Sequence, residues 1–261
     1  MSEAVGRIEP VEAVKFPADL PEEDGIPLES NWHCIQINLL VELTHQLWAK
    51  RADYFAGGNM FLYFSARQAR TLDYRGPDFF VVKGVESKSE RRSWKTWEED
   101  GRFPDVIVEL LSPRTATADL TTKKQLYERT FRTPEYFAYD PDARQLQGWR
   151  LEHGYHELQP NEHGWLWSEE LQVWLGKWEG DYEAVRATWL RFYTRAGELT
   201  PTGEETAAAR AEAEVAARRE AEARAATEAV ARRETEARAA AAEAELARLR
   251  AELARLQGGP D

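Results

Sequence analysis

The sequence is poor in cysteine and has no long apolar run. Its single cysteine, Cys34, cannot form an internal disulfide. No stretch approaches the roughly 20 apolar residues that a membrane-spanning helix needs, and no basic start followed by an apolar run suggests a signal peptide. We therefore expect a protein of the reducing cytoplasm that has no membrane association.

Aromatic residues are absent from position 201 onward. All ten Trp, nine Tyr and ten Phe precede that position, whereas Ala, Glu and Arg dominate the rest. A chain of 261 residues with 43% hydrophobic content can bury one sizeable core. We expect one globular domain over residues 30–202, an extended N-terminal arm over 1–29, a helical tail over 203–257 and a disordered end over 258–261.

Acidic residues outnumber basic ones, 46 against 34. The formal net charge is -12, and the segment from Pro201 carries 10 Arg against 13 acidic residues, so about -9 remains on the globular part. Non-specific DNA affinity comes mainly from Lys and Arg that neutralise phosphates. The composition argues against a strong general DNA binder, and any DNA contact must depend on a local basic patch or a bound cation.

Several common catalytic motifs are missing. The five His show no spacing typical of zinc ligands, and no glycine-rich loop is present to hold phosphates. Ser112-Pro113 lacks the flanking glycines of a hydrolase nucleophile. His33 and His45 lie in or beside the first predicted helix, where we expect them to pack or to face solvent.

Apolar spacing predicts an amphipathic helix followed by a mixed sheet. Ile35, Leu39 and Leu43 recur every four residues within a helix predicted over 31–50. Short, nearly continuous apolar runs indicate strands that are covered on both faces, and a strand, helix and strand in succession predict a crossover. The Trp-rich segment 165–199 is expected to wrap the core. Strands are predicted over 59–65, 78–82, 105–111, 135–140, 146–151, 155–158 and 189–193, and a second helix over 119–131.

The tail is made almost entirely of strong helix formers, and the Gly-Gly-Pro sequence at 258–260 stops the run. A continuous helix of this length would reach roughly 80 Å. Leu246, Leu249, Leu253 and Leu256 step by three and four, whereas earlier turns offer mostly Ala. This pattern favours a homo-oligomer that associates through the C-terminal helix, with a solvated single helix as the alternative.

Two acids on neighbouring predicted strands could share a cation. Phosphodiester hydrolysis needs a cation that binds the scissile phosphate and lowers the pKa of a water, and Mg²⁺ prefers one or two carboxylates plus waters. Asp78 opens one strand, and Glu109 lies late in the next, between apolar neighbours on its face. A carboxylate in that place is unfavourable unless it is paired, protonated or bound to a metal. A salt bridge to a core Lys or Arg is therefore the alternative.

A positively charged side chain beside these acids could orient a water or stabilise charge on the phosphate. Lys123 lies on the following helix, and Tyr127 falls four residues later on the same face. Lys124 is a competing candidate whose simpler role is an ion pair with Glu128. Glu42 on the first helix is a candidate for an additional acid, with a solvated helix face as the alternative.

Basic and aromatic side chains alternate in the segment 83–102. Lys88, Arg91 and Lys95 are interleaved with Trp94 and Trp97, and such residues can hold phosphates and stack bases. Five acidic residues dilute the positive charge of the same segment. A packed surface hairpin is therefore favoured over a nucleic-acid contact.

Seven short motifs follow one another along the chain. Each motif alone is a weak indication of a family, but the seven in this order are specific. In that order they resemble the Uma2 (DUF820) family of restriction endonucleases, within the PD-(D/E)XK nuclease superfamily, over about residues 30–205. The motifs are Pro77-Asp78, Pro104 to Pro113, Asp119 to Tyr127, Glu135 to Phe137, Asp140-Pro141, Leu146 to Leu151 and Leu190 to Tyr193.

The resemblance implies an α/β fold with a restriction-endonuclease-like mixed sheet flanked by helices. It implies a metal-dependent DNA endonuclease in which Asp78, Glu109 and the backbone carbonyl of Leu110 bind Mg²⁺ or Mn²⁺. The superfamily usually places a catalytic Lys two positions after the Glu, where this chain has Leu111, so the resemblance assigns that role to Lys123. A non-catalytic scaffold with an oligomerising tail is the alternative, and RNA or a branched junction is an alternative substrate.

Overall fold

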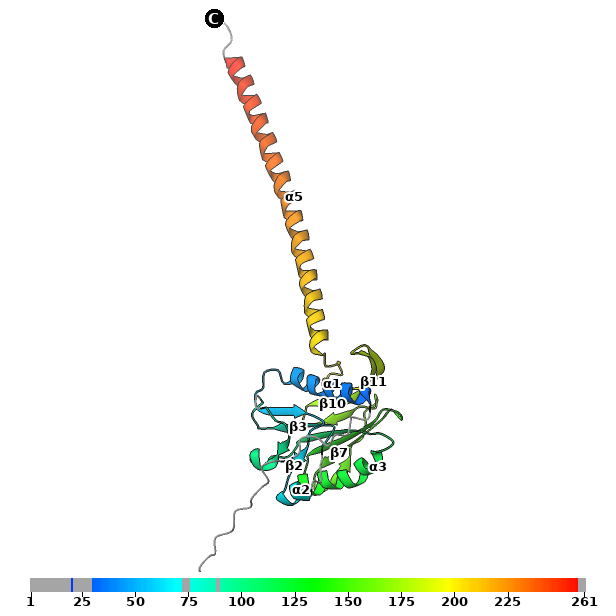
Figure 1. Ribbon diagram of the computed structural model, residues 1–261. Helices are drawn as coiled ribbons and strands as arrows, with labels where there is room; N and C mark the ends of the chain where they lie inside the picture. Colours follow the sequence, from blue (N-terminus) through cyan, green and yellow to red (C-terminus); the bar gives the residue numbers. More distant parts are fainter. Residues whose placement is uncertain (1–19, 21–29, 72–75, 88–89, 258–261) are drawn as a thin grey trace, which may run out of the picture. The chain divides into compact units, whose positions relative to one another are not determined.

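The computed structural model describes residue 20 and residues 30–71, 76–87 and 90–257 (Figure 1). The chain divides into two units, Met1–Gly203 and Glu204–Asp261. The arm predicted over 1–29 and the end predicted over 258–261 lie outside the described residues, apart from Leu20. Within the described ranges, no helix combines the length and the apolar character needed to cross a membrane.

A six-stranded mixed sheet forms the centre of the first unit. The strand order is β1-β3-β5-β6-β7-β8, in which β5 and β6 are parallel and all other neighbours are antiparallel. Helices flank the sheet and one long helix ends the chain, so the predicted fold class is confirmed. The strands are β1 (Tyr54–Gly57), β3 (Phe79–Lys83), β5 (Val106–Leu110), β6 (Glu135–Asp140), β7 (Gln145–Leu151) and β8 (Tyr155–Glu157).

The central strand β5 is buried on both faces, as its continuous apolar run predicts. Val106, Val108 and Leu110 pack in the cluster that includes α1 (Asn31–Leu47). Ile107 packs in the opposite cluster, under the helical segment that follows β5. Figure 1 shows α1 and α3 (Ala116–Ala118), the first turn of that helical segment, on opposite sides of the sheet. The strand therefore lies at the middle of a three-layer arrangement.

The helix α1 begins where its polar cap predicts. Ser30 is the N-cap, and its hydroxyl accepts a hydrogen bond from the backbone N–H of His33 at 3.3 Å. Leu39, Leu40 and Leu43 are fully buried against the sheet. The helix prediction is confirmed, with an end at Leu47 instead of residue 50.

The crossover from β5 to β6 is one composite helical segment. It comprises α3 (Ala116–Ala118), the π-helical turn η2 (Asp119–Lys123), α4 (Lys124–Leu126) and the π-helical turn η3 (Tyr127–Phe131). It begins three residues before the predicted helix and ends at Arg132, whose φ of 56° is left-handed. Turns of this π type are rare and occur often at functional sites.

The Trp-rich segment forms a second, three-stranded sheet in the order β11-β10-β9. The predicted strand over 189–193 is the second half of β11, whereas β9 and β10 were not predicted. Gly176 lies in β10 because the Trp165 ring occupies the adjacent space, and a Cβ there would come within 2.2 Å of Trp165 Cδ1. Such glycines interrupt the apolar alternation by which a strand is recognised. The strands are β9 (Leu166–Ser168), β10 (Val173–Tyr182) and β11 (Val185–Tyr193).

The strand predicted over 59–65 is wrong in its extent. Only β2 (Leu62–Tyr63) is extended there, and it pairs in parallel with β4 (Trp94–Lys95). One edge strand of the main sheet is β1, which ends at the first residue of the glycine pair, Gly57. A Cβ on Gly58 would lie 2.0 Å from the backbone oxygen of Asp78. The chain therefore bends where it touches the start of β3. The remaining short elements are α2 (Ala66–Thr71) and the 3-10 helix η1 (Thr96–Glu98).

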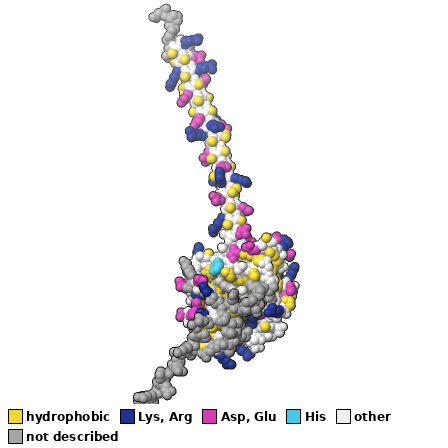
Figure 2. Space-filling model, viewed as in Figure 1, with side chains coloured by type: hydrophobic (Ala, Val, Ile, Leu, Met, Phe, Trp, Pro, Cys, Tyr) yellow, Lys and Arg dark blue, Asp and Glu magenta, His cyan; other side chains and the backbone are white. Residues whose placement is uncertain are grey.

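The described part of the second unit is the helix α5, which begins at Gly203, the last residue of the first unit, and ends at Gln257. Every side chain from residue 207 to 255 is exposed. Figure 2 shows acidic and basic side chains alternating along it. A helix without a buried face must gain its stability from helix propensity and from side-chain pairs along its own surface.

Candidate functional site

Asp78 and Glu109 come together at neighbouring strand ends. In the antiparallel register Phe79 pairs with Val108, so Asp78 lies beside Glu109 on the same face of the sheet. The backbone N–H of Asp78 lies 3.4 Å from Glu109 Oε2, and the backbone N–H of Leu110 donates to Asp78 Oδ2 at 2.7 Å. The two acids that the sequence singled out thus share one corner of the core.

Lys123 faces the same corner from the composite helical segment. Its ammonium group lies 3.1 Å from Glu109 Oε2 and 2.8 Å from Asp119 Oδ1. The Glu109 side chain has no exposed surface, whereas 21% of the Lys123 side chain is exposed. Asp78 is also partly exposed. The cluster is therefore reached from solvent past Asp78 and Lys123, with Glu109 behind them.

Tyr127 and Asp119 complete the cluster, although sequence reasoning gave neither a role in it. The Tyr127 hydroxyl donates to Glu109 Oε1 at 2.6 Å, and the Tyr136 hydroxyl donates to the backbone oxygen of Asp119 at 3.0 Å. Asp119, Lys123 and Tyr127 follow one another at intervals of four residues. That spacing places them on one helix face and is the signal by which Asp119 could have been found.

His33 reaches the backbone carbonyl of Leu110 from the opposite layer. Its Nε2 lies 3.3 Å from the Leu110 oxygen, and its Nδ1 lies 2.8 Å from Ser30 Oγ. A carbonyl oxygen only accepts, so this contact requires the ring proton on Nε2. Nothing local in the sequence marks the contact, because 77 residues separate the partners.

The cluster holds more negative than positive charge in a desolvated place. Burial raises the pKa of Glu109 to about 7, although the Lys123 ammonium beside it acts in the opposite direction. Burial likewise raises the pKa of Asp78 and of Asp119. Burial by itself lowers the pKa of Lys123, but the three carboxylates raise it further than burial lowers it. An added cation would relieve this excess of negative charge.

Two other candidates lie elsewhere. The Glu42 carboxylate accepts hydrogen bonds at 2.7 Å from the Tyr182 hydroxyl and at 2.7 Å from the backbone N–H of Gly203. Lys124 extends over the Trp149 ring, with its Nζ 3.7 Å from the ring centroid. Glu42 therefore binds the last residue of β10 and the first residue of α5, away from the two acids. Lys124 makes a cation–π contact and does not face the acids.

The oxygen donors at the cluster fit a hard divalent cation. Across the described residues, no group of three or more His, Cys, Asp and Glu side chains is arranged to hold a metal. Mg²⁺ does not need such a group, because it keeps several waters and binds through one or two carboxylates. Asp78 and Glu109 supply two carboxylates. The Leu110 carbonyl is on the same edge of β5 as the N–H that binds Asp78, since both groups of one strand residue point the same way.

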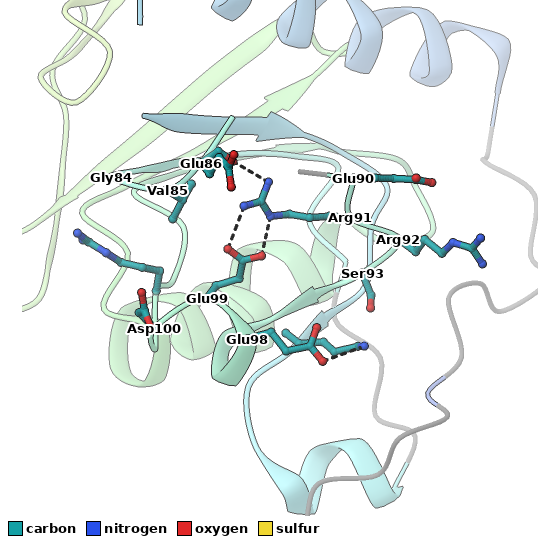
Figure 3. Close-up of a pocket in the computed structure, with 12 residues that line it drawn as sticks. Gly84, Val85, Glu86, Glu90, Arg91, Arg92, Ser93, Glu98, Glu99 and Asp100 are labelled. Atoms are coloured by element: carbon teal, nitrogen blue, oxygen red, sulfur yellow. Dashed lines mark hydrogen bonds and ion pairs between the residues drawn. The ribbon is translucent and has the colours of Figure 1, made fainter. Parts of the chain in front are cut away.

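The segment between β3 and β5 encloses a polar cavity of about 490 Å³ (Figure 3). Arg91 points across it to Glu99, with contacts of 2.6 and 3.0 Å, and donates to the backbone oxygen of Glu86 at 2.9 Å. The segment connects the antiparallel neighbours β3 and β5, but it is no simple hairpin, because its own strand Trp94–Lys95 pairs in parallel with β2. Lys88 lies outside the described residues. A nucleic-acid role for this segment stays a prediction. The charge of Arg91 is already balanced by Glu99.

A match to a protein-family model shows which family the chain belongs to. The model of the Uma2 family, described as "Putative restriction endonuclease", matches residues 25–177. The chain belongs to the Uma2 family. The match spans the sheet strands β1 to β8 and the whole cluster around Glu109, so the resemblance inferred from the motifs is confirmed.

Similarity to known proteins beyond the Uma2 family model is limited. No curated protein matches the chain. Among solved structures, the chain is similar to the "putative nuclease belonging to DUF820" from Anabaena variabilis ATCC 29413. The sequence identity is 14% and the TM-score 0.41, over 56% of this chain and 76% of the other.

Proposed function

We propose that this Uma2 protein is a metal-dependent DNA endonuclease that hydrolyses phosphodiester bonds, with its active site at Asp78, Glu109 and Lys123. The observation that carries the proposal is that two carboxylates and one ammonium group meet where β3 begins and β5 ends, next to the backbone of Leu110, whose carbonyl points to the same side of β5. Membership of a family described as restriction endonucleases supports the reaction type. DNA as substrate rests on that family description.

The Asp78 and Glu109 carboxylates and the Leu110 carbonyl would hold Mg²⁺ or Mn²⁺. Their hard oxygen donors, and the raised pKa values of both acids, support this assignment, because a cation would favour the ionised carboxylates. When bound, the cation would neutralise charge on the scissile phosphate and lower the pKa of a water.

The remaining residues hold this arrangement in place. Tyr127 fixes the Glu109 carboxylate through Oε1, which leaves Oε2 directed toward Asp78 and Lys123. Lys123, held by Asp119 as well, presents its ammonium where negative charge develops on a phosphate. His33 orients the Leu110 carbonyl from the other side of β5. A Lys from the following helix thus takes the role that Leu111 cannot fill.

Space for substrate exists on the His33 side of Leu110, in a cavity that the Asp78, Glu109 and Lys123 side chains do not line. This cavity of about 430 Å³ is lined by His33, Ser112 and Arg144 together with Trp32 and Pro141. His33 lines this cavity and also contacts the Leu110 carbonyl. An aromatic ring and a guanidinium group suit a nucleotide that flanks the scissile bond.

The test is metal-dependent nicking of supercoiled plasmid by the full chain in Mg²⁺ and in Mn²⁺. We expect Asp78→Asn and Lys123→Ala each to lower the nicking rate about 100-fold or more, because the first removes a ligand of the cation and the second removes a positive charge that stabilises the transition state. The matched controls are Asp53→Asn, at an exposed acid paired with Arg51, and Lys124→Ala, next to Lys123. These should keep the wild-type rate, and circular dichroism should show all four variants folded.

The rival function is a non-catalytic scaffold with a nuclease-like core. The Lys123–Glu109 pair favours this rival, because a buried carboxylate with bonds to both oxygens needs no metal to be satisfied. Calorimetry of the wild type with Mn²⁺ separates the two. No Mn²⁺ binding, together with no metal-dependent cleavage of DNA, would establish the scaffold and refute the endonuclease.

A further inference from the structure

The distal end of α5 carries an apolar seam of regularly spaced leucines. Residues 244–250 and 251–257 have the same sequence except at the last position, which makes a repeat of seven. Leu246, Leu249 and Leu253 are 53%, 50% and 56% exposed. Leucines exposed to this degree at regular heptad spacing are typical of an unpaired coiled-coil seam. The seam positions, at alternating steps of three and four, are Ala239, Ala242, Leu246, Leu249, Leu253 and Leu256.

The preceding part of α5 has a different repeat. Residues 217–226 and 231–240 share nine of ten amino acids at an offset of fourteen. The repeat carries ion pairs along the helix, such as Arg218–Glu222 at 2.9 Å and Arg232–Glu236 at 2.7 Å. If the seam spacing is continued toward the N-terminus of α5, its positions include Arg232 and Glu228, which cannot form an apolar contact. It is a self-supporting helix, and the seam begins only at Ala239.

We propose that residues 239–256 bind the same segment of a second copy of this chain, in parallel and in register. The charged residues that flank the seam select this partner. In a parallel coiled coil, charged residues on either side of the seam pair between the two helices. The residue directly before Ala239 or Leu246 lies beside the residue five positions further along the other helix. Arg238 would then face Glu243 of the second copy, and Glu245 would face Arg250 of the second copy. Both pairs are of opposite charge, and each occurs twice.

The antiparallel alignment of the same six positions gains less. It would place Glu245 beside Glu252 of the second copy, which are like charges, although Arg250 and Glu243 would still attract. Within one chain, Arg238 and Glu245 have only loose partners, with contacts of 3.9 Å to Glu234 and to Arg248. Their charges are therefore available to a second helix. Two of the six layers are Ala, so we expect association that depends on concentration.

Disulfide trapping tests the direction of pairing. Ala242 occupies a seam position that would adjoin its own counterpart in a parallel pair, whereas Ala241 points away from the seam. We expect the full chain with Cys34→Ser and Ala242→Cys to form a covalent dimer under mild oxidation, because the two thiols would lie within disulfide distance. The chain with Cys34→Ser and Ala241→Cys is the matched control and should stay mostly monomeric. Equal trapping of both variants would overturn the parallel register.

Charge reversal tests the choice of partner. In sedimentation equilibrium of the full chain, Arg250→Glu should raise the dissociation constant about tenfold, because two attractions become repulsions. Adding Glu245→Arg should restore the wild-type constant, which loss of helix stability would not do. A wild-type chain that sediments as a monomer at all concentrations, with no disulfide through Ala242→Cys, would overturn the proposal. Neither readout depends on nuclease activity.

Discussion

Glu109 combines complete burial with hydrogen bonds to both carboxylate oxygens. Tyr127 donates to Oε1 at 2.6 Å, and Lys123 approaches Oε2 to 3.1 Å. From the sequence, a metal ligand and a salt-bridge partner were alternatives for this residue. The geometry makes them compatible, because the Lys leaves Oε2 facing Asp78. Removing Lys123 would take away the compensating charge of the buried carboxylate, and removing Tyr127 would leave Oε1 without its hydrogen bond.

The raised pKa of Glu109 predicts a pH-dependent stability. Its value is about 7 in the folded chain against 4.5 as the ordinary value of Glu. Between these pH values the unfolded chain has released the proton and the folded chain still holds it, so the free energy of unfolding falls as pH rises. We expect this fall in the wild type and a smaller one in Glu109→Gln. The measurement is urea denaturation at about pH 5 and pH 7.5 with chelator present.

A control for this experiment is Glu42→Gln, which changes another hydrogen-bonded Glu away from the cluster. It should follow the pH dependence of the wild type. If Glu109→Gln and the wild type lost the same free energy over this window, Glu109 would not carry the raised pKa.

At the scale of secondary structure, the contact between β1 and β3 fixes the position of Asp78. The backbone N–H of Asn59 donates to the backbone oxygen of Asp78 at 3.1 Å, and Gly58 lies directly against that oxygen. The sequence marks 57–58 only as a break. The structure shows that the missing side chain at Gly58 lets the two strands approach one another at the site.

Gly58→Ala is therefore expected to lower the free energy of unfolding by about 1–3 kcal/mol, because the added methyl group would displace backbone that cannot move freely. Gly154→Ala is the matched control. Its Cβ would meet only the end of the Glu128 side chain at 3.0 Å. Thermal denaturation followed by circular dichroism checks both. Equal stability of the two variants would show that the approach at Gly58 is looser than described.

Strands with continuous apolar character were predicted well, and strands with interrupted patterns were not. β3, β5 and β6 lie in the middle of the sheet, where both faces exclude water, so nearly every position is apolar. β10 contains Gly176 and Gly180, whose space is taken by the rings of Trp165 and Trp178. Trp165 lies outside β10 and Trp178 within it, and neither ring contact is recorded by the apolar alternation along the strand.

At the scale of the whole molecule, the globular unit should fold without the tail. Every side chain from residue 207 to 255 is exposed, so removing them takes no residue from the core. We expect a chain that ends at Thr206 to keep its thermal midpoint within about 2 °C of the full chain. Differential scanning calorimetry checks this expectation. A larger decrease would show that the globular unit depends on the tail.

The sequence by itself determined the fold class, the helical tail and the two acids at the candidate site. These follow from local patterns, namely apolar runs, helix-forming composition and an acid set between apolar neighbours, because such patterns reflect which faces a segment must bury. The family resemblance also indicated Lys123, but only the tertiary structure decided that Tyr127, Asp119 and His33 complete the surroundings of those acids. Lys123 and Tyr127 reach Glu109 because the composite helix packs on one face of β5, and His33 reaches Leu110 because α1 packs on the other. Contacts between layers depend on how whole elements pack, and spacing along one element cannot encode them.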